Sequence, residues 1–159
     1  MRLPVEDLIR EHQKHLFAAA FSICQNTSDA DDVVQDTFLK YHLCKNDFSS
    51  PEHIRAWLMR VAINKAKDVT RRIWRRKTVP LDEVGEMAAA ETDEGAWLLG
   101  QVMKLPEKYR IVLHLFYYED YSVSEIAKIL KLSESNVKTR LSRARAMLKT
   151  SLKEDLVYE

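Results

Sequence analysis

The chain has 159 residues, enough for one ordinary domain or two small ones, and its 46% apolar share is typical of a globular protein. Only three glycines and four prolines are present, which argues against a meander of short strands and favours helices. Two cysteines, Cys24 and Cys44, are too few for a disulfide scaffold, and no apolar run is long enough to span a bilayer. We therefore expect a cytoplasmic protein without direct membrane insertion, and a redox role for either cysteine stays open.

The net charge of +1 conceals separate charged blocks along the chain. Residues 55–77 carry nine basic residues and one acid, whereas residues 78–103 carry six acids and no Lys or Arg. Residues 104–159 return to a net charge of +3. Two basic blocks divided by an acidic stretch are typical of two anion-binding surfaces joined by a tether.

Apolar residues at helical spacing predict a first helix over residues 4–24. Ser28 is the predicted N-cap of a second helix, whose positive end carries several acids. The residues of this helix predicted to face the core are Ala30, Val33, Val34, Thr37, Phe38 and Tyr41. Those predicted to face outward are Asp32, Gln35, Asp36 and Leu39.

A polar loop precedes a third predicted helix, which has Ser50 as its cap and Pro51 in its first turn and runs to about Lys77. Its predicted inward side chains are Ile54, Trp57, Leu58, Val61 and Ala62. Its other side carries Arg60, Asn64, Lys67 and Arg71. A basic helix with tryptophans suits a membrane surface or a partner, but Lys65 and Asp68 interrupt its apolar stripe. Interleaved aromatic and cationic side chains also suit unpaired bases.

Residues 78–92 contain a proline, a glycine and acids with little to bury, so we predict a flexible acidic linker there. A second helical unit is predicted from residue 93, with a helix to Lys104 and a break at Leu105 and Pro106. The next predicted helix runs through residues 111–118. The aromatic side chains expected to pack in the core of this unit are Phe116, Tyr117 and Tyr118.

The last part of the chain has the pattern of a helix-turn-helix. Ser122 and Glu125 form a predicted capping box, followed by a short helix, a tight turn at Lys131 and a new cap at Ser133. In the final helix one apolar stripe contains Val137, Leu141, Ala144 and Leu148. The opposite side contains Ser135, Asn136, Thr139, Ser142 and Arg143. The flanks carry Lys138, Arg145 and Lys149 on one side and Arg140 on the other. Short polar groups between cations suit the base edges and phosphates of a DNA major groove.

The chain resembles a bacterial sigma factor of the extracytoplasmic-function (group IV) type in three motifs: DADDVVQDTFLKY, RAWLMRVAINKAKD and LPEKYRIVLHLFYYEDYSVSEIAKILKLSESNVKTRLSRARAML. The resemblance covers nearly the whole chain. It implies an all-α fold of two small helical domains, sigma domain 2 at residues 1–77 and sigma domain 4 at residues 93–159. The implied function is to bind core RNA polymerase and direct it to promoter DNA, for a stress or envelope regulon. An anti-sigma factor is an implied further partner.

The resemblance also assigns roles to residues. It implies that the polymerase clamp is bound by Asp32, Gln35 and Asp36. Phe48 matches the loop that holds a base flipped from the −10 element. The adjoining helix, which handles the melted strand, matches at Arg60, Asn64, Lys67 and Asp68. The helical spacing adds Arg71 to this group. The positions that read the −35 element in the family match Lys138, Thr139, Ser142 and Arg143. The helical wheel adds four residues to this set: Ser135, Asn136, Arg140 and Arg145. Lys131 departs from the family, because many relatives have glycine in this turn.

Other classes of protein fit less well. We find no glycine-rich phosphate loop, nucleophile elbow or paired carboxylates in an apolar pocket, so an enzyme is disfavoured and no cofactor is expected. His12 and His15 lie one helical turn apart but lack a third ligand, so no metal site is expected. The remaining alternative is a small helix-turn-helix regulator with an N-terminal dimerisation or sensing module. The acidic helix and the basic block favour the sigma factor, because such a regulator needs only one duplex-binding surface.

Overall fold

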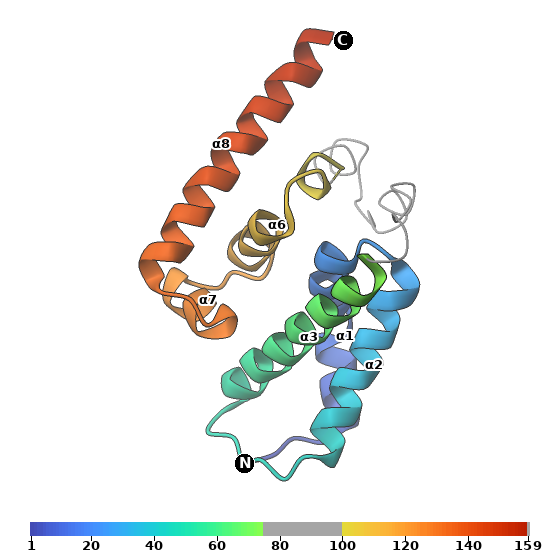
Figure 1. The fold of residues 1–159 in the computed structure, drawn as a ribbon. Coiled ribbons are helices and arrows are strands. Elements are labelled where there is room, and N and C mark those ends of the chain that lie inside the picture. Colours follow the sequence, from blue (N-terminus) through green and yellow to red (C-terminus); the bar gives the residue numbers. More distant parts are fainter. Residues whose placement is uncertain (75–99, 159) are drawn as a thin grey trace. The chain divides into compact units, whose positions relative to one another are not determined.

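A computed structural model describes residues 1–74 and 100–158, with the side chains of these residues except at 73–74 and 154–158. The described residues form helices and turns without a strand, so the all-α expectation is confirmed (Figure 1). The chain divides into two compact units, Met1–Pro80 and Leu81–Glu159. The predicted linker at 78–92 lies outside the described residues. Within the described ranges, no helix is both long enough and apolar enough to cross a membrane.

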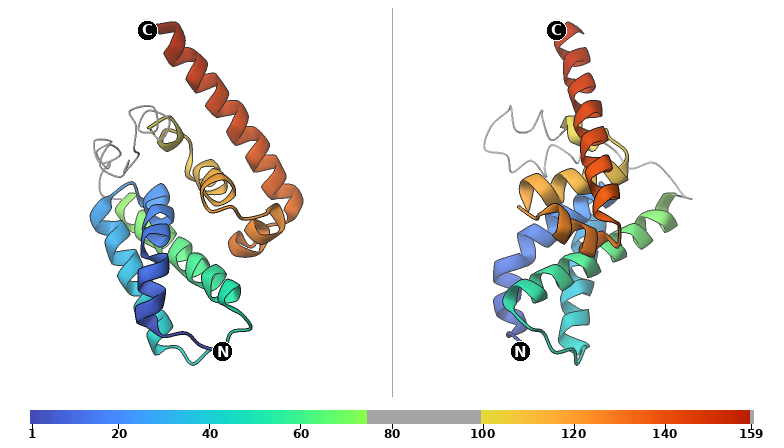
Figure 2. Two further views of the ribbon diagram at one scale, coloured as in Figure 1. Left: turned by 180° about the vertical axis from the view of Figure 1, so that it is seen from behind. Right: turned by 90° about the vertical axis from the view of Figure 1, so that its left-hand side faces the viewer.

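The first unit consists of three helices that pack against one another: α1 (Val5–Cys24), α2 (Thr27–Leu43) and α3 (Pro51–Trp74). All three lie side by side in Figures 1 and 2. Their shared core contains Leu8, Leu16, Phe21, Ile54, Leu58 and Ile63, each at most 1% exposed. The predicted helix over residues 4–24 is confirmed, with Pro4 as its N-cap.

α2 buries the six residues predicted from the sequence, and its predicted outward residues are exposed. Its N-cap was predicted wrongly. Asn26, not Ser28, caps the helix, and the Asn26 Oδ1 accepts a hydrogen bond from the backbone N–H of Asp29 at 2.9 Å. Both residue types are good N-caps, and the helix begins at the earlier of the two.

The start of α3 agrees with the prediction. The Ser50 Oγ accepts a hydrogen bond from the backbone N–H of His53 at 3.1 Å, as an N-cap should. The predicted inward residues of α3 are buried, apart from Trp57, which is half-buried. The predicted end near Lys77 lies outside the described residues.

The second unit begins with helical residues 100–103 and continues with α6 (Glu107–Leu113), η1 (His114–Tyr118), α7 (Val123–Leu130) and α8 (Glu134–Tyr158). The predicted break before α6 is confirmed, with Pro106 as its N-cap. The single predicted helix through residue 118 differs from the structure, because η1 is a π-turn. The backbone N–H of Glu119 donates to the carbonyl oxygen of His114, five residues back, at 3.1 Å.

The expectation that the aromatic side chains of η1 fill the core was wrong for the two tyrosines. Tyr117 is 57% exposed and Tyr118 is 58% exposed, while Phe116 is half-buried. Within η1 and its flanks, the buried apolar positions belong to Leu113 and Leu115. The core of this unit is completed by side chains that include Ile111, Val112, Ile126, Val137 and Leu141.

The predicted helix-turn-helix is confirmed as local structure. The Ser122 Oγ accepts from the Glu125 N–H at 3.1 Å, and the Glu125 Oε1 accepts from the Ser122 N–H at 3.0 Å. Lys131 ends α7 in the left-handed region, with φ 57° and ψ 48°. The Ser133 Oγ then accepts from the Asn136 N–H at 3.0 Å, which caps α8.

Replacing the left-handed lysine by glycine is expected to stabilise the second unit. This backbone conformation costs a non-glycine residue roughly 1–2 kcal/mol. The greater freedom of glycine in the unfolded chain offsets about 0.4–1 kcal/mol of that gain. Lys131→Gly should therefore slow hydrogen exchange at the Val137 and Leu141 amides. As the matched control, Lys128→Gly inside α7 should speed exchange, because glycine in a helix interior costs about 1 kcal/mol. Faster exchange in both variants would contradict the strain argument.

Candidate functional site

The outer face of α2 carries the residues expected to bind the polymerase. Asp32, Gln35 and Asp36 are all exposed, and the buried face of the helix lies on its other side. Two exposed apolar side chains continue the same face toward the C-terminal end: Leu39 is 54% exposed and Leu43 is 69% exposed. Steps of three and four residues keep Asp36, Leu39 and Leu43 on one side of the helix.

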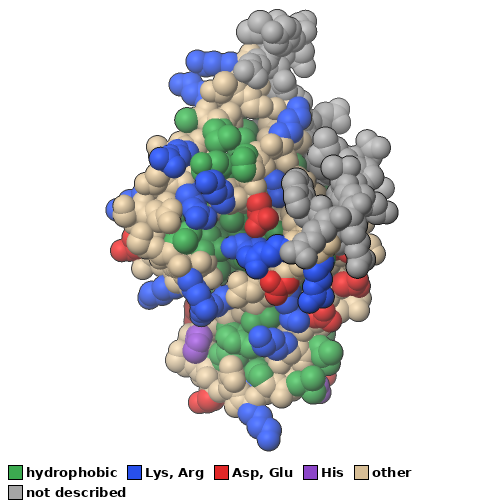
Figure 3. Space-filling view, in the orientation of Figure 1, with side chains coloured by type: hydrophobic (Ala, Val, Ile, Leu, Met, Phe, Trp, Pro, Cys, Tyr) green, Lys and Arg blue, Asp and Glu red, His purple; other side chains and the backbone are tan. Residues whose placement is uncertain are grey.

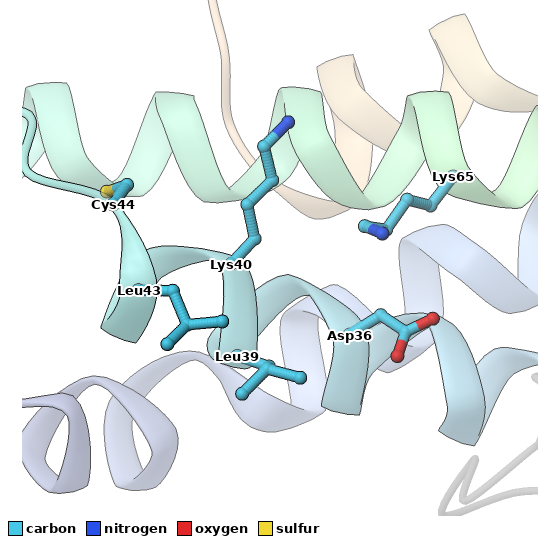
Figure 4. A pocket seen from close by; sticks show the side chains of 6 residues that line it. All are labelled: Asp36, Leu39, Lys40, Leu43, Cys44 and Lys65. Carbon is cyan, nitrogen blue, oxygen red and sulfur yellow. The ribbon is translucent and has the colours of Figure 1, made fainter.

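A groove runs beside this face of α2. It is lined by Asp36, Leu39, Lys40, Leu43, Cys44 and Lys65. Figure 4 shows Leu39 and Leu43 next to each other on α2, with Lys40 pointing toward α3. Sequence reasoning placed Leu39 outward but missed Leu43, Lys40 and Lys65. The signal that could have found the groove is a pair of leucines four residues apart on an otherwise polar face.

The outward side of α3 brings together the residues expected to handle a melted strand. Asn64, Asp68 and Arg71 are exposed, while Arg60 and Lys67 are half-buried. The Arg71 Nη1 lies 3.8 Å from the Asp68 Oδ1, and both side chains stay largely in solvent. Such an exposed pair is weak, so both groups are available to a nucleic acid. On the face in Figure 3, basic side chains are spread over α3 and over α8.

Phe48, which the resemblance places in the loop expected to hold a flipped base, has a buried side chain. It is 3% exposed. Its ring centroid lies 5.7 Å from that of Tyr41, 5.6 Å from that of Trp57 and 5.2 Å from that of His53. Phe48 therefore anchors the loop between α2 and α3, and its role toward a flipped base stays a prediction. The loop residues exposed around it are Asn46, Asp47 and Ser49.

The face of α8 expected to enter a DNA groove is exposed. Its short polar side chains and its arginine at the centre are Ser135, Asn136, Thr139, Ser142 and Arg143. The opposite stripe is buried at Val137, Leu141 and Ala144, with Leu148 half-buried. Lys138 is exposed on one flank. On the other flank Arg140 is half-buried, and its Nε donates to the Asn136 Oδ1 at 3.1 Å, which leaves the Asn136 amide nitrogen as a donor.

Arg145 is held by a residue that sequence reasoning did not connect with it. Its Nε donates to the Tyr117 hydroxyl oxygen at 2.6 Å. Its guanidinium carbon lies 5.6 Å from the ring centroids of both Phe116 and Tyr117. Because 28 residues separate Tyr117 from Arg145, no local pattern predicts the pair. The contact fixes the direction of one flanking cation of α8.

Comparison with known proteins identifies both units. Residues 8–76 match the family described as Sigma-70 region 2, and residues 96–148 match Sigma-70, region 4. The ECF RNA polymerase sigma factor SigM of Mycobacterium tuberculosis (strain ATCC 25618 / H37Rv) is 30% identical over 149 residues, covering 92% of this chain and 76% of SigM. The chain belongs to the extracytoplasmic-function (ECF) family of RNA polymerase sigma factors. The sigma factor CnrH of Cupriavidus metallidurans is 34% identical over 166 residues, covering 93% of this chain and 86% of CnrH.

Solved structures of two sigma factors are similar to this one. CnrH in complex with the cytosolic domain of CnrY matches with a TM-score of 0.69 and 33% identity, over 95% of this chain and 88% of CnrH. RpoE in complex with the anti-sigma factor NepR from Bartonella quintana matches with a TM-score of 0.72 over 93% of this chain and 98% of RpoE. At 23% identity the second likeness shows the fold alone.

This sigma factor directs transcription initiation by RNA polymerase, as the resemblance implied. The alternative, a small regulator with an N-terminal dimerisation module, is not favoured, because the N-terminal unit matches sigma region 2. Sigma factors are regulatory proteins that do not themselves catalyse a reaction. No cluster of three metal-ligating side chains occurs in the part of the chain that the structure describes.

Proposed function

We propose that this sigma factor uses three separate surfaces to start transcription. The outer face of α2 binds the polymerase clamp, α3 with its preceding loop binds the melted −10 strand, and α8 reads the −35 duplex. The observation that carries the proposal is the exposed face of α8. Compact polar side chains at its centre, with cations on its flanks, match what base edges and phosphates require.

The proposed polymerase surface combines charge with apolar area. Asp32 and Asp36 offer carboxylates, and Leu39 with Leu43 offers exposed apolar side chains along the groove of α2. A protein interface commonly pairs a desolvated apolar centre with charged groups that fix orientation. The groove therefore extends the proposed clamp-binding surface beyond the acids that the sequence indicated.

The proposed −10 surface has one side of α3 at its centre. Arg60, Lys67 and Arg71 supply positive charge for the backbone of a single strand, and Asn64 supplies an amide for a base edge. The loop anchored by Phe48 adjoins the start of this helix. We propose that exposed loop groups, rather than the buried ring of Phe48, contact a base that has left the duplex.

Run-off transcription tests the whole proposal. The purified chain, mixed with core RNA polymerase, should give a promoter-dependent transcript that neither component gives alone. The chain should also co-purify with core in the absence of DNA. A chain that binds duplex DNA but neither associates with core nor starts transcription would contradict the proposal.

An anti-sigma factor is a further proposed partner. CnrH, which is 33% identical to this chain, was solved in complex with the cytosolic domain of CnrY. By that likeness, a protein inhibitor should hold this sigma factor away from the polymerase. A purified inhibitor complex is expected to show no binding to core until the inhibitor is removed.

Two arginines of α8 are expected to behave differently when each is changed to alanine. Arg143 lies on the groove-facing side, so Arg143→Ala should cost about 1–3 kcal/mol and relax specificity at one upstream base pair. Arg145 is held at a flank by Tyr117, so Arg145→Ala should weaken all sequences alike and flatten the salt dependence. Binding to a panel of −35 sequences at several salt concentrations measures both effects.

Tyr117→Phe is the matched control for this pair. It removes only the hydroxyl oxygen that accepts from Arg145, and Tyr117 is exposed, so folding should not suffer. Its effect should resemble a weaker form of Arg145→Ala, uniform across sequences. Identical sequence profiles for Arg143→Ala and Arg145→Ala would show that placing Arg143 in the groove and Arg145 at a flank is wrong.

A further inference from the structure

The first three residues of the chain pair with the loop between α2 and α3. The backbone N–H of Phe48 donates to the carbonyl oxygen of Met1 at 3.1 Å. The Tyr41 hydroxyl donates to the carbonyl oxygen of Leu3 at 2.7 Å and accepts from the Leu3 N–H at 3.0 Å. Tyr41, in the last turns of α2, and Phe48, in the loop, are thus both tied to this segment.

Arg2 makes the most extensive of these contacts. Its Nη2 donates to the carbonyl oxygen of Tyr41 at 2.8 Å, and its Nη1 donates to that of Asn46 at 2.7 Å. Its guanidinium carbon lies 4.5 Å from the ring centroid of Tyr41 and 6.0 Å from that of Phe48. The Nη1 also lies 3.6 Å from the Cys44 Sγ. One side chain therefore bridges the end of a helix, the middle of the loop and the aromatic anchor beneath it.

The two hydrogen bonds from Arg2 hold a loop that has no regular structure of its own. Residues 44–48 have no regular hydrogen-bonding pattern of their own. The carbonyl of Tyr41 lies in the last turn of α2, where four carbonyls lack partners within the helix and where a positive charge is favourable. Asn46 follows three residues after α2 ends, in the exposed part of the loop. A guanidinium with two N–H groups aimed at two fixed carbonyls restricts the path between them more than a single point charge can.

We infer that Arg2 is a positioning residue for base recognition at the −10 element. It acts through the loop that it holds, by fixing where the exposed groups around Asn46 lie relative to α3. The inference rests on the proposed function, in which this loop and α3 bind the melted strand. Direct contact of Arg2 with a DNA phosphate is the competing role, because each terminal nitrogen donates to one carbonyl and keeps a second N–H.

A test should separate loop positioning from phosphate contact. The full chain is combined with core polymerase on promoters that carry a pre-melted −10 region, with each of the four bases in turn at the flipped position. Single-round transcription then gives a base-preference profile, and its decline with salt gives a slope. The variants are Arg2→Gln and Arg2→Lys. The control is Arg10→Gln, which changes an exposed α1 arginine whose ion-pair partner is Asp7.

Arg2→Gln is expected to reduce the preference between bases by about threefold or more, the size of one lost hydrogen bond, without changing the salt slope. Arg2→Lys keeps the charge but loses the fixed fork of two terminal nitrogens, so it should flatten the profile in the same way. Arg10→Gln should keep the wild-type profile. Circular dichroism checks folding, and if Arg2→Gln is unfolded, Arg2→Lys carries the test.

An unchanged base profile in a folded Arg2 variant overturns the inference. A lower salt slope with an unchanged profile overturns it too, and assigns Arg2 to a phosphate. A wild-type chain that shows no base preference on the melted promoter overturns the proposed −10 surface itself. That result comes from the wild-type chain, whereas failure of the Arg2 inference is seen only in the variants, so the two failures can be told apart.

Discussion

Changing Asp32 and Asp36 to lysine together is expected to abolish binding to core RNA polymerase while leaving the first unit folded. Both side chains are exposed on α2, whereas the core of the unit is formed by the opposite face of that helix. Exposed substitutions usually change stability by only about 0.5 kcal/mol. Close charge pairs across an interface are worth about 1.5–7 kcal/mol, so affinity should fall by roughly 100-fold or more.

The measurement is a binding titration of core polymerase with the labelled chain, at low and moderate salt. Glu6→Lys with Glu11→Lys on α1 is the matched control, because both acids are exposed and the change in net charge is equal. The control should bind core normally. Wild-type affinity in a folded Asp32 and Asp36 double variant would falsify the assignment of this face to the polymerase.

Asn64→Ala is expected to leave closed promoter complexes almost unchanged and to slow their opening by about tenfold, the upper range for one lost hydrogen bond. Asn64 is exposed on α3, and a base edge can reach its amide only after the base leaves the duplex. Permanganate reactivity of promoter thymines measures opening, and filter binding measures the closed complex. A promoter with a pre-melted −10 region should largely restore transcription. Normal opening by Asn64→Ala would remove this residue from the proposed surface.

Phe48 must be tested in a different way, because its side chain is buried. Truncating a buried phenylalanine typically costs about 3–5 kcal/mol, a large part of the stability of a small unit. Phe48→Ala is therefore expected to impair core binding and promoter opening together, through loss of folded protein. A defect in promoter opening can be assigned to lost contact with the melted strand only in a variant that remains folded. Asn64→Ala is expected to remain folded.

Helical faces and helix caps could be predicted from the sequence, because each depends only on residues that lie a few positions apart. The buried side of α2 follows from apolar residues at steps of three and four, and the stripe of α8 around Val137 and Leu141 follows in the same way. The capping box at Ser122 needs only two residues three apart. The cap of α2 was missed by two residues, because Asn26 and Ser28 compete locally for one role.

Features that depend on distant parts of the chain could not be predicted. Phe48 is buried because Tyr41 and Trp57 enclose it, and no local pattern reports that enclosure. The same holds for Tyr117, whose hydroxyl accepts from Arg145, and for Arg2, which bonds with residues 39 and 44 positions away. The resemblance supplied the correct family and placed Phe48 in the loop before α3, but it gave no sign that the Phe48 side chain is buried.

The π-turn at η1 makes the second unit sensitive to changes in chain length at one place. A turn closed five residues back contains one residue more than the α-helical turn, so residues after it are rotated by about 100° relative to a continuous α-helix. Tyr117, whose hydroxyl accepts from Arg145, lies inside this turn. Deleting a single residue from 114–116 would leave the side chains of the α8 face proposed to read the −35 element unchanged, yet it should change the direction of Tyr117 relative to α8. A one-residue insertion or deletion within residues 114–116 should therefore break the hydrogen bond between Tyr117 and Arg145 more readily than a substitution there.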